Sequence, residues 1–121
     1  MNLNFSSIMI GTNNSKALAD FYEKVLDQKS DWEDGEWYGF QIGNTHLTIG
    51  LHSEVKGKAK EPQRIILNFE TTKVKDEFER IKKTGAKVIK APYEIEGMWI
   101  ATIADPDGNY FQLMTPWEEK K

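Results

Sequence analysis

Residues 105–114 read DPDGNYFQLM, a tight turn followed directly by a strand. The proline of this stretch presets φ and its glycine accepts the left-handed conformation, so its first five residues predict a turn. The alternating apolar residues that follow predict a strand. We expect Phe111 and Leu113 to face a helix, and Gln112 and Met114 to face the opposite side of the sheet.

The residues that precede this strand supply one helix and three further strands. Val74, Phe78 and Ile81 recur at helical spacing, and Gly85 suits the C-cap of that helix. Apolar alternation and turn residues predict the strands at 64–69, 87–90 and 98–104.

The first half of the chain repeats the same order of elements. One helix is predicted by an apolar stripe preceded by the capping residues Thr12, Asn13, Asn14 and Ser15; the stripe consists of Leu18, Phe21, Tyr22, Val25 and Leu26. Strands are predicted at 3–10, 29–33, 37–42 and 46–51.

Local sequence also repeats, because DGEW at 34–37 corresponds to EGMW at 96–99, and each segment opens a strand. We interpret the chain as a duplicated unit in a single domain. Module one covers 1–52, an exposed polar linker covers 53–63 and module two covers 64–121.

Composition limits the function classes. The 121 residues are 39% apolar and 29% charged, which is typical of a globular protein. The chain has no cysteine, so disulfides, thiolate metal sites and cysteine nucleophiles are excluded. The net charge of −3 argues against nucleic-acid binding, and no apolar run is long enough for a membrane span. We therefore expect a soluble, cytoplasmic protein.

Two stretches carry a family resemblance: 17–26, ALADFYEKVL, and 105–114, DPDGNYFQLM. With the duplication, they resemble the vicinal oxygen chelate superfamily, which includes glyoxalases, bleomycin-resistance proteins and extradiol dioxygenases. The resemblance implies an α+β fold in which two βαβββ modules form an incomplete barrel around a cup. It also implies a divalent metal in the enzymes, held by histidine, glutamate or glutamine on the first and last strand of each module.

The positions that match those family ligands depart from the pattern. They fall on Ser7, Thr48, Arg64 and Gln112, with His46 as the alternative to Thr48 if the preceding turn is longer. A permanent guanidinium repels a metal ion, and hydroxyl groups are poor partners for one. We therefore expect neither a family-type metal centre nor another cofactor.

Strand alternation predicts the lining of the cup. Phe5, Asn68 and Glu70 are also expected to face it, whereas Ile65, Leu67 and Phe69 are expected to pack under a helix. The predicted ligand-binding residues are Ser7, Met9, Trp37, Thr48, Arg64, Ile66, Trp99, Gln112 and Met114. Such a mixture of apolar, aromatic and a few polar side chains is typical of a small-molecule pocket.

Trp37, Trp99 and Arg64 each have competing interpretations. Each of the two tryptophans either packs in a core or caps a sheet edge, or forms a flat wall for a planar ligand, or makes a dimer contact. Arg64 either forms an ordinary salt bridge, for instance with Glu70, or contacts Gln112, or binds an anion through its planar guanidinium group. Trp32 and Trp117 are interpreted as peripheral, and His46 and His52 as surface residues.

Three functions follow from these observations. The first is a metal-free small-molecule-binding protein of the bleomycin-resistance type, with a planar or aromatic, anionic ligand in the cup or in a dimer groove. The second is a metal-dependent lyase or dioxygenase that uses His46, Glu70 and Gln112, and whether the protein is an enzyme stays open. The third is a structural or regulatory module whose cup is filled by its own side chains. Open strand edges and the family resemblance favour a homodimer.

Overall fold

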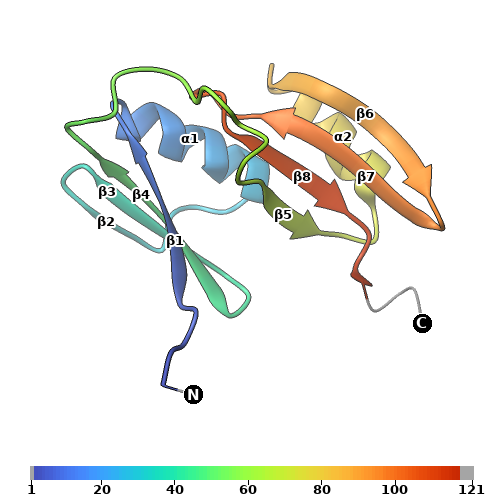
Figure 1. The fold of residues 1–121 in the computed structure, drawn as a ribbon, viewed down its shortest axis with the longest axis horizontal. Helices are drawn as coiled ribbons and strands as arrows, with labels where there is room; N and C mark the ends of the chain where they lie inside the picture. The colour runs from blue at the N-terminus through green and yellow to red at the C-terminus, as the bar shows by residue number, and fades with distance from the viewer. Residues whose placement is uncertain (1, 118–121) are drawn as a thin grey trace. The chain divides into compact units, whose positions relative to one another are not determined.

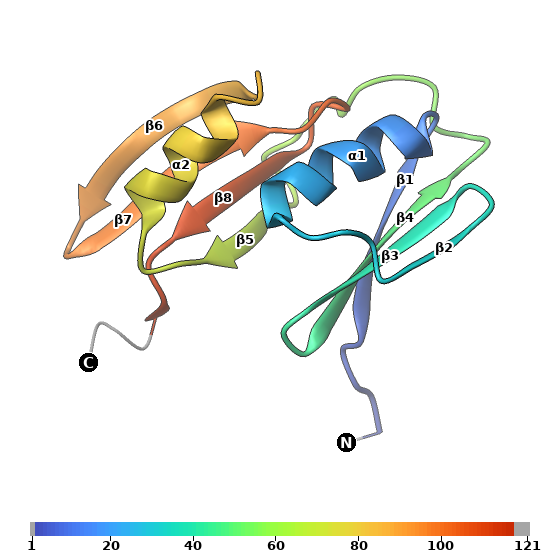
Figure 2. The ribbon, with the colours of Figure 1, turned by 180° about the vertical axis from the view of Figure 1, so that it is seen from behind.

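The computed structural model describes residues 2–117 and divides into two compact units, 1–57 and 58–121. The division falls within the segment predicted as a linker. Each unit contains one helix and one four-stranded sheet (Figures 1 and 2), so the predicted α+β fold of two βαβββ modules is confirmed.

The first unit contains, in chain order, β1 (Ser7–Thr12), α1 (Ser15–Leu26), β2 (Trp32–Asp34), β3 (Trp37–Ile42) and β4 (Thr45–Leu51). Its strand order is β1-β4-β3-β2, with β1 parallel to β4 and the other pairs antiparallel. Helix α1 begins as predicted, because the Asn14 side chain accepts a hydrogen bond from the backbone N–H of Ala17 at 3.2 Å. The helix packs against one face of this sheet.

The second unit contains β5 (Leu67–Glu70), α2 (Val74–Lys82), β6 (Lys87–Ile95), β7 (Met98–Ala104) and β8 (Tyr110–Met114). Its strand order is β5-β8-β7-β6, which repeats the topology of the first unit. Strands β3, β7 and β8 have the predicted bounds. Asp105 and Asn109 hold the predicted turn, because the Asp105 Oδ1 accepts hydrogen bonds from the backbone N–H groups of Asp107 and Asn109, each at 2.9 Å.

Both cores lie between a helix and its own sheet. In the first unit the buried apolar side chains are Leu18, Ala19, Tyr22, Val25, Tyr38, Phe40, Leu47 and Ile49. In the second unit they include Val74, Phe78, Ile81, Ala101, Ile103, Phe111 and Leu113. The helical stripes and the strand alternation predicted these cores because only one face of each helix meets the sheet.

Several predicted boundaries were wrong. Strand β1 begins at Ser7 rather than at residue 3, because its pairing with the parallel strand β4 begins at Ser7–His46. Strand β2 covers Trp32–Asp34 rather than 29–33, and β5 begins at Leu67 rather than at residue 64.

In the second unit, strand β6 runs to Ile95 rather than ending at residue 90. Two register shifts lie between Val88 and Tyr93, and the second contains Pro92, which has no N–H to donate to a regular ladder. Helix α2 is capped by Lys83 rather than by Gly85, which lies two residues beyond the cap with φ +93°. No helix within residues 2–117 is long and apolar enough to cross a membrane.

Candidate binding face

The first sheet has one face covered by α1 and one face that α1 does not cover. Strand alternation and register place Tyr38, Phe40, Leu47 and Ile49 under the helix. We call the other side the open face; its residues are Ser7, Met9, Gly11, Trp32, Asp34, Trp37, Gly39, Gln41, His46, Thr48 and Gly50. It therefore carries two tryptophans, one methionine, three glycines and several short polar side chains.

Two tryptophans on the open face lie against glycines of the neighbouring strand. Trp32 is the register partner of Gly39, and Trp37 is the register partner of Gly50. A β-carbon on either glycine would overlap the facing indole, well inside 3.0 Å. Both glycines are buried, whereas Trp32 and Trp37 remain 45% and 38% exposed. Each indole thus covers a bare stretch of backbone and exposes part of its own surface to solvent.

Four of the predicted ligand-binding residues share this face. Ser7, Met9 and Thr48 stand on β1 and β4, and Trp37 stands on β3. His46 was the alternative to Thr48, but the two residues are two positions apart on β4 and therefore face the same side. Phe5, also expected on this side, precedes β1 and is 74% exposed.

The open face is bordered by carboxylates. Asp34 is the register partner of Trp37, so the two side chains project from the same face. Asp31 immediately precedes Trp32, and its carboxylate accepts a hydrogen bond from the backbone N–H of Gln41. Strands β1 to β4 contain no lysine or arginine. The charged side chains that register and hydrogen bonding place beside this face are therefore carboxylates.

In the second sheet, Gln112 and Met114 lie on the face away from α2, as predicted. The Gln112 Nε2 donates a hydrogen bond to the Thr102 Oγ1 at 3.2 Å, and Thr102 is buried. The residue of β5 in register with Gln112 is Asn68. Ile66 precedes β5 and is half-buried.

Arg64 does not stand on a strand, contrary to the prediction. It lies in a turn in which its backbone N–H donates to the Glu61 carbonyl at 3.0 Å. Its guanidinium pairs with the Glu61 carboxylate at 2.6 Å, and the Arg64 side chain is 72% exposed. Its ionic partner is therefore Glu61, rather than Glu70 or Gln112.

Trp99 is not the counterpart of Trp37, contrary to the alignment of the two repeats. Trp37 and Met98 each open a strand and pair back across a two-residue turn, with Asp34 and Ile95 respectively. Trp99 is one residue further along, and a shift of one residue moves a side chain to the opposite face of a strand. It therefore lies on the face that α2 covers. The Nζ of Lys75, a residue of α2, stands 3.8 Å from the ring centroid of Trp99.

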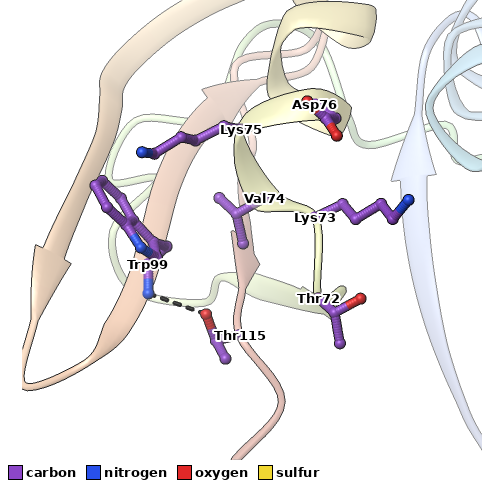
Figure 3. A pocket seen from close by; sticks show the side chains of 7 residues that line it. All are labelled: Thr72, Lys73, Val74, Lys75, Asp76, Trp99 and Thr115. Atoms are coloured by element: carbon purple, nitrogen blue, oxygen red, sulfur yellow. Dashed lines mark hydrogen bonds between the residues drawn. The ribbon is translucent and has the colours of Figure 1, made fainter.

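A hollow of about 290 Å³ surrounds Trp99 at the start of α2 (Figure 3). Its lining residues are Thr72, Lys73, Val74, Lys75, Asp76, Trp99 and Thr115. The Thr115 Oγ1 accepts a hydrogen bond from the Trp99 backbone N–H at 3.0 Å, close to the start of β7. The Lys75 ammonium lies over one face of the indole, as the close-up shows. The residues that line this hollow all belong to the second unit, whereas the residues of the open face belong to the first.

The residues at the family's ligand positions do not fit a divalent metal. Ser7, Thr48 and Gln112 offer only neutral oxygens, Arg64 carries a positive charge, and the alternative residue His46 adds a single imidazole. Within residues 2–117, no three or more His, Asp or Glu side chains gather where they could hold a metal ion. The donor set of this chain is therefore unsuited to the metal centre that the resemblance implies.

The family model of the glyoxalase-like domain matches residues 7–114, which is most of the chain. The chain belongs to the glyoxalase-like domain family. This assignment confirms the resemblance to the vicinal oxygen chelate superfamily. No curated protein matches the sequence.

Solved structures agree with the fold of this glyoxalase-like domain. A glyoxalase/bleomycin resistance protein/dioxygenase family enzyme from Burkholderia phytofirmans PsJN is 25% identical, with 93% of this chain and 98% of that chain covered and a TM-score of 0.77. A glyoxalase-related enzyme from Fulvimarina pelagi is 18% identical over 96% of this chain and 89% of that chain, with a TM-score of 0.77. Lactoylglutathione lyase from Agrobacterium tumefaciens is 17% identical over 91% of each chain, with a TM-score of 0.70.

The contacts of Trp32 and Trp37 with two glycines were not predicted from the sequence. Trp32 was interpreted as peripheral, but it covers Gly39 as Trp37 covers Gly50. The signal was present in the sequence, because a glycine inside an alternating strand often marks a close approach by another group. Gly39 and Gly50 are such glycines, and each is followed by an apolar residue of its strand.

Proposed function

We propose that this glyoxalase-like domain binds a small organic molecule without a metal ion, on the open face of the first sheet. The observation that carries the proposal is the pair of indoles laid over Gly39 and Gly50. They leave a flat, half-exposed aromatic surface next to Met9 and Thr48. Apolar and aromatic walls with a few polar groups are the usual composition of a small-molecule site.

The donor chemistry supports a metal-free role. Imidazole and carboxylate groups hold catalytic divalent ions, and the family's ligand positions here carry mainly hydroxyl, amide and guanidinium groups. Lyase chemistry of the kind named for the Agrobacterium relative belongs to that protein. For this chain we propose binding, not metal-assisted conversion.

The test is a thermal-shift screen of purified protein treated with EDTA. A ligand that binds only the native state raises the midpoint of unfolding, because it adds RT ln(1 + [L]/Kd) to the free energy of unfolding. We expect EDTA itself to leave the melting temperature unchanged and at least one compound of the library to raise it.

Paired variants locate the binding site. Met9→Lys places a charge on the open face, and Ile65→Lys places the same charge at an exposed apolar residue outside the first sheet. We expect Met9→Lys to abolish the shift and Ile65→Lys to preserve it. Compounds that bind only after a divalent ion is added back would contradict the proposal and favour the metal-dependent lyase or dioxygenase with His46, Glu70 and Gln112.

A further inference from the structure

The two indoles of the open face form one platform. Trp32 lies over Gly39 on β3, and Trp37 lies over Gly50 on β4. Gly39 pairs with Thr48, so Gly50 stands one strand across and two residues along from Gly39. Strand spacing and rise then separate the two covered glycines by roughly 8 Å. A planar ligand of two or three fused rings is long enough to reach both covered positions.

Two carboxylates lie beside the platform. Asp34 shares a ladder position and a face with Trp37, and Asp31 precedes Trp32 and is held at the backbone N–H of Gln41. The nearest lysine in the sequence, Lys29, lies 3.9 Å from Glu23, and its side chain is 92% exposed. A cation over an indole face is attracted by the ring quadrupole, and a neighbouring carboxylate adds to that attraction.

We infer that the ligand of the open face is a planar organic cation, stacked on Trp32 and Trp37 with its charge beside Asp34. This inference rests on the proposed metal-free binding function and names the class of its ligand. The sequence had favoured an anionic ligand because of Arg64. Arg64 is exposed and already paired with Glu61, so it no longer supports an anionic ligand.

The experiment compares three probes on the full chain by isothermal titration calorimetry. The tricyclic cation 9-aminoacridine is the expected ligand, and 9-anthracenecarboxylate has the same ring size with a negative charge. Cyclohexylammonium carries the positive charge without a planar ring. We expect saturable binding of 9-aminoacridine with one molecule per chain, and affinities at least about tenfold lower for the other two probes.

Matched variants test the two parts of the platform. Trp32→Leu and Trp37→Leu remove the stacking surfaces, and Trp117→Leu removes an exposed indole outside the platform. Asp34→Asn removes the open-face carboxylate, and Glu33→Gln neutralises its neighbour on β2, which pairs with Tyr38 on the other face. We expect a loss of affinity for 9-aminoacridine of at least about fivefold from the platform variants and from Asp34→Asn, and less than twofold from the two controls.

The failures of the inference and of the proposed function are distinguishable. Equal or tighter binding of 9-anthracenecarboxylate, or unchanged affinity in Asp34→Asn, overturns the cationic class while the open face stays a binding site. Unchanged affinity in both tryptophan variants overturns the platform. Asp34 lies at an exposed strand end, so its variant stays informative if a tryptophan variant fails to fold. If no probe binds but the thermal-shift screen yields other ligands, this inference fails alone; if nothing binds in either experiment, the proposed function fails with it.

Discussion

Trp37 and Gly50 occupy one ladder position of β3 and β4, and the missing β-carbon of the glycine lets the indole lie against the sheet. The contact serves both the fold and the proposed function, because it buries the backbone of β4 and also orients an exposed aromatic surface. The same arrangement recurs one strand away at Trp32 and Gly39. A cross-strand aromatic over a glycine is a recognised way to protect a strand that has no side chain of its own to pack.

The first prediction concerns this contact. Gly50→Ala forces the Trp37 indole off the sheet, and such overpacking costs about 1–3 kcal/mol of the free energy of unfolding. Denaturant unfolding followed by tryptophan fluorescence measures the loss. Gly57→Ala is the control, because a β-carbon at Gly57 meets nothing within 4 Å. Equal stability of the two variants would contradict the stacking.

The second prediction concerns Tyr38, which lies in the core of the first unit. Burial, and to a smaller extent the charge of Glu33, raise the pKa of the Tyr38 phenol above its usual range. The folded state therefore favours the neutral phenol. This contribution to stability is complete below the ordinary phenol pKa of about 10 and is lost as the pH rises through the higher folded pKa.

The measurement is the free energy of unfolding between neutral pH and the alkaline range. We expect a decline in wild type that Tyr38→Phe reduces, because this variant has no phenol to ionise at that position. Tyr110→Phe, on strand β8, is the matched control and should leave the decline in place. A decline of the same size in Tyr38→Phe would show that another group causes it.

The third prediction concerns the cation–π contact of Lys75 with Trp99. Lys75→Gln removes the ammonium 3.8 Å from the ring centroid and should cost about 0.5–1 kcal/mol of the free energy of unfolding. The near-ultraviolet circular dichroism of Trp99 should change with it. Lys73→Gln alters a second lysine of the same hollow without touching this contact, so it should leave both signals unchanged.

The sequence predicted some elements of the fold correctly and others incorrectly. The turn at Asp105–Asn109 and strands β3, β7 and β8 were predicted correctly, because turn chemistry and two-residue alternation are local properties. Strand ends such as Ser7 and Leu67 were not, since they depend on where a distant partner strand begins. Local alternation contains no information on that partner.

The candidate site was predictable in part for the same reason. Alternation placed Ser7, Met9 and Thr48 on one face, and the structure brings them together there. The predicted face of Trp99 was wrong. The two-residue turns are 35–36 and 96–97, so the glycine is the first turn residue in DGEW and the second in EGMW. Aligning the two glycines therefore displaces the following strand by one residue. A shift of one residue reverses the face of a whole strand.

The fourth prediction is a homodimer. Large apolar side chains remain exposed on the described residues, among them Leu3, Phe5 and Ile65. Strands β1 and β2 are edges of their sheet, and a second copy of the chain can cover such edges and apolar groups. Sedimentation equilibrium at micromolar concentration should give twice the chain mass of 13.9 kDa. A species of single-chain mass throughout would contradict the prediction.

The most direct test of the central claim, metal-free binding on the open face, is a ¹H–¹⁵N spectrum of the indole N–H groups in EDTA-treated protein. The chain has four tryptophans, so the signals separate the open face from the rest of the molecule. We predict that adding 9-aminoacridine shifts the signals of Trp32 and Trp37 and leaves those of Trp99 and Trp117 in place. Shifts confined to Trp99, or shifts of Trp32 and Trp37 that appear only after a divalent metal is added, would contradict the account.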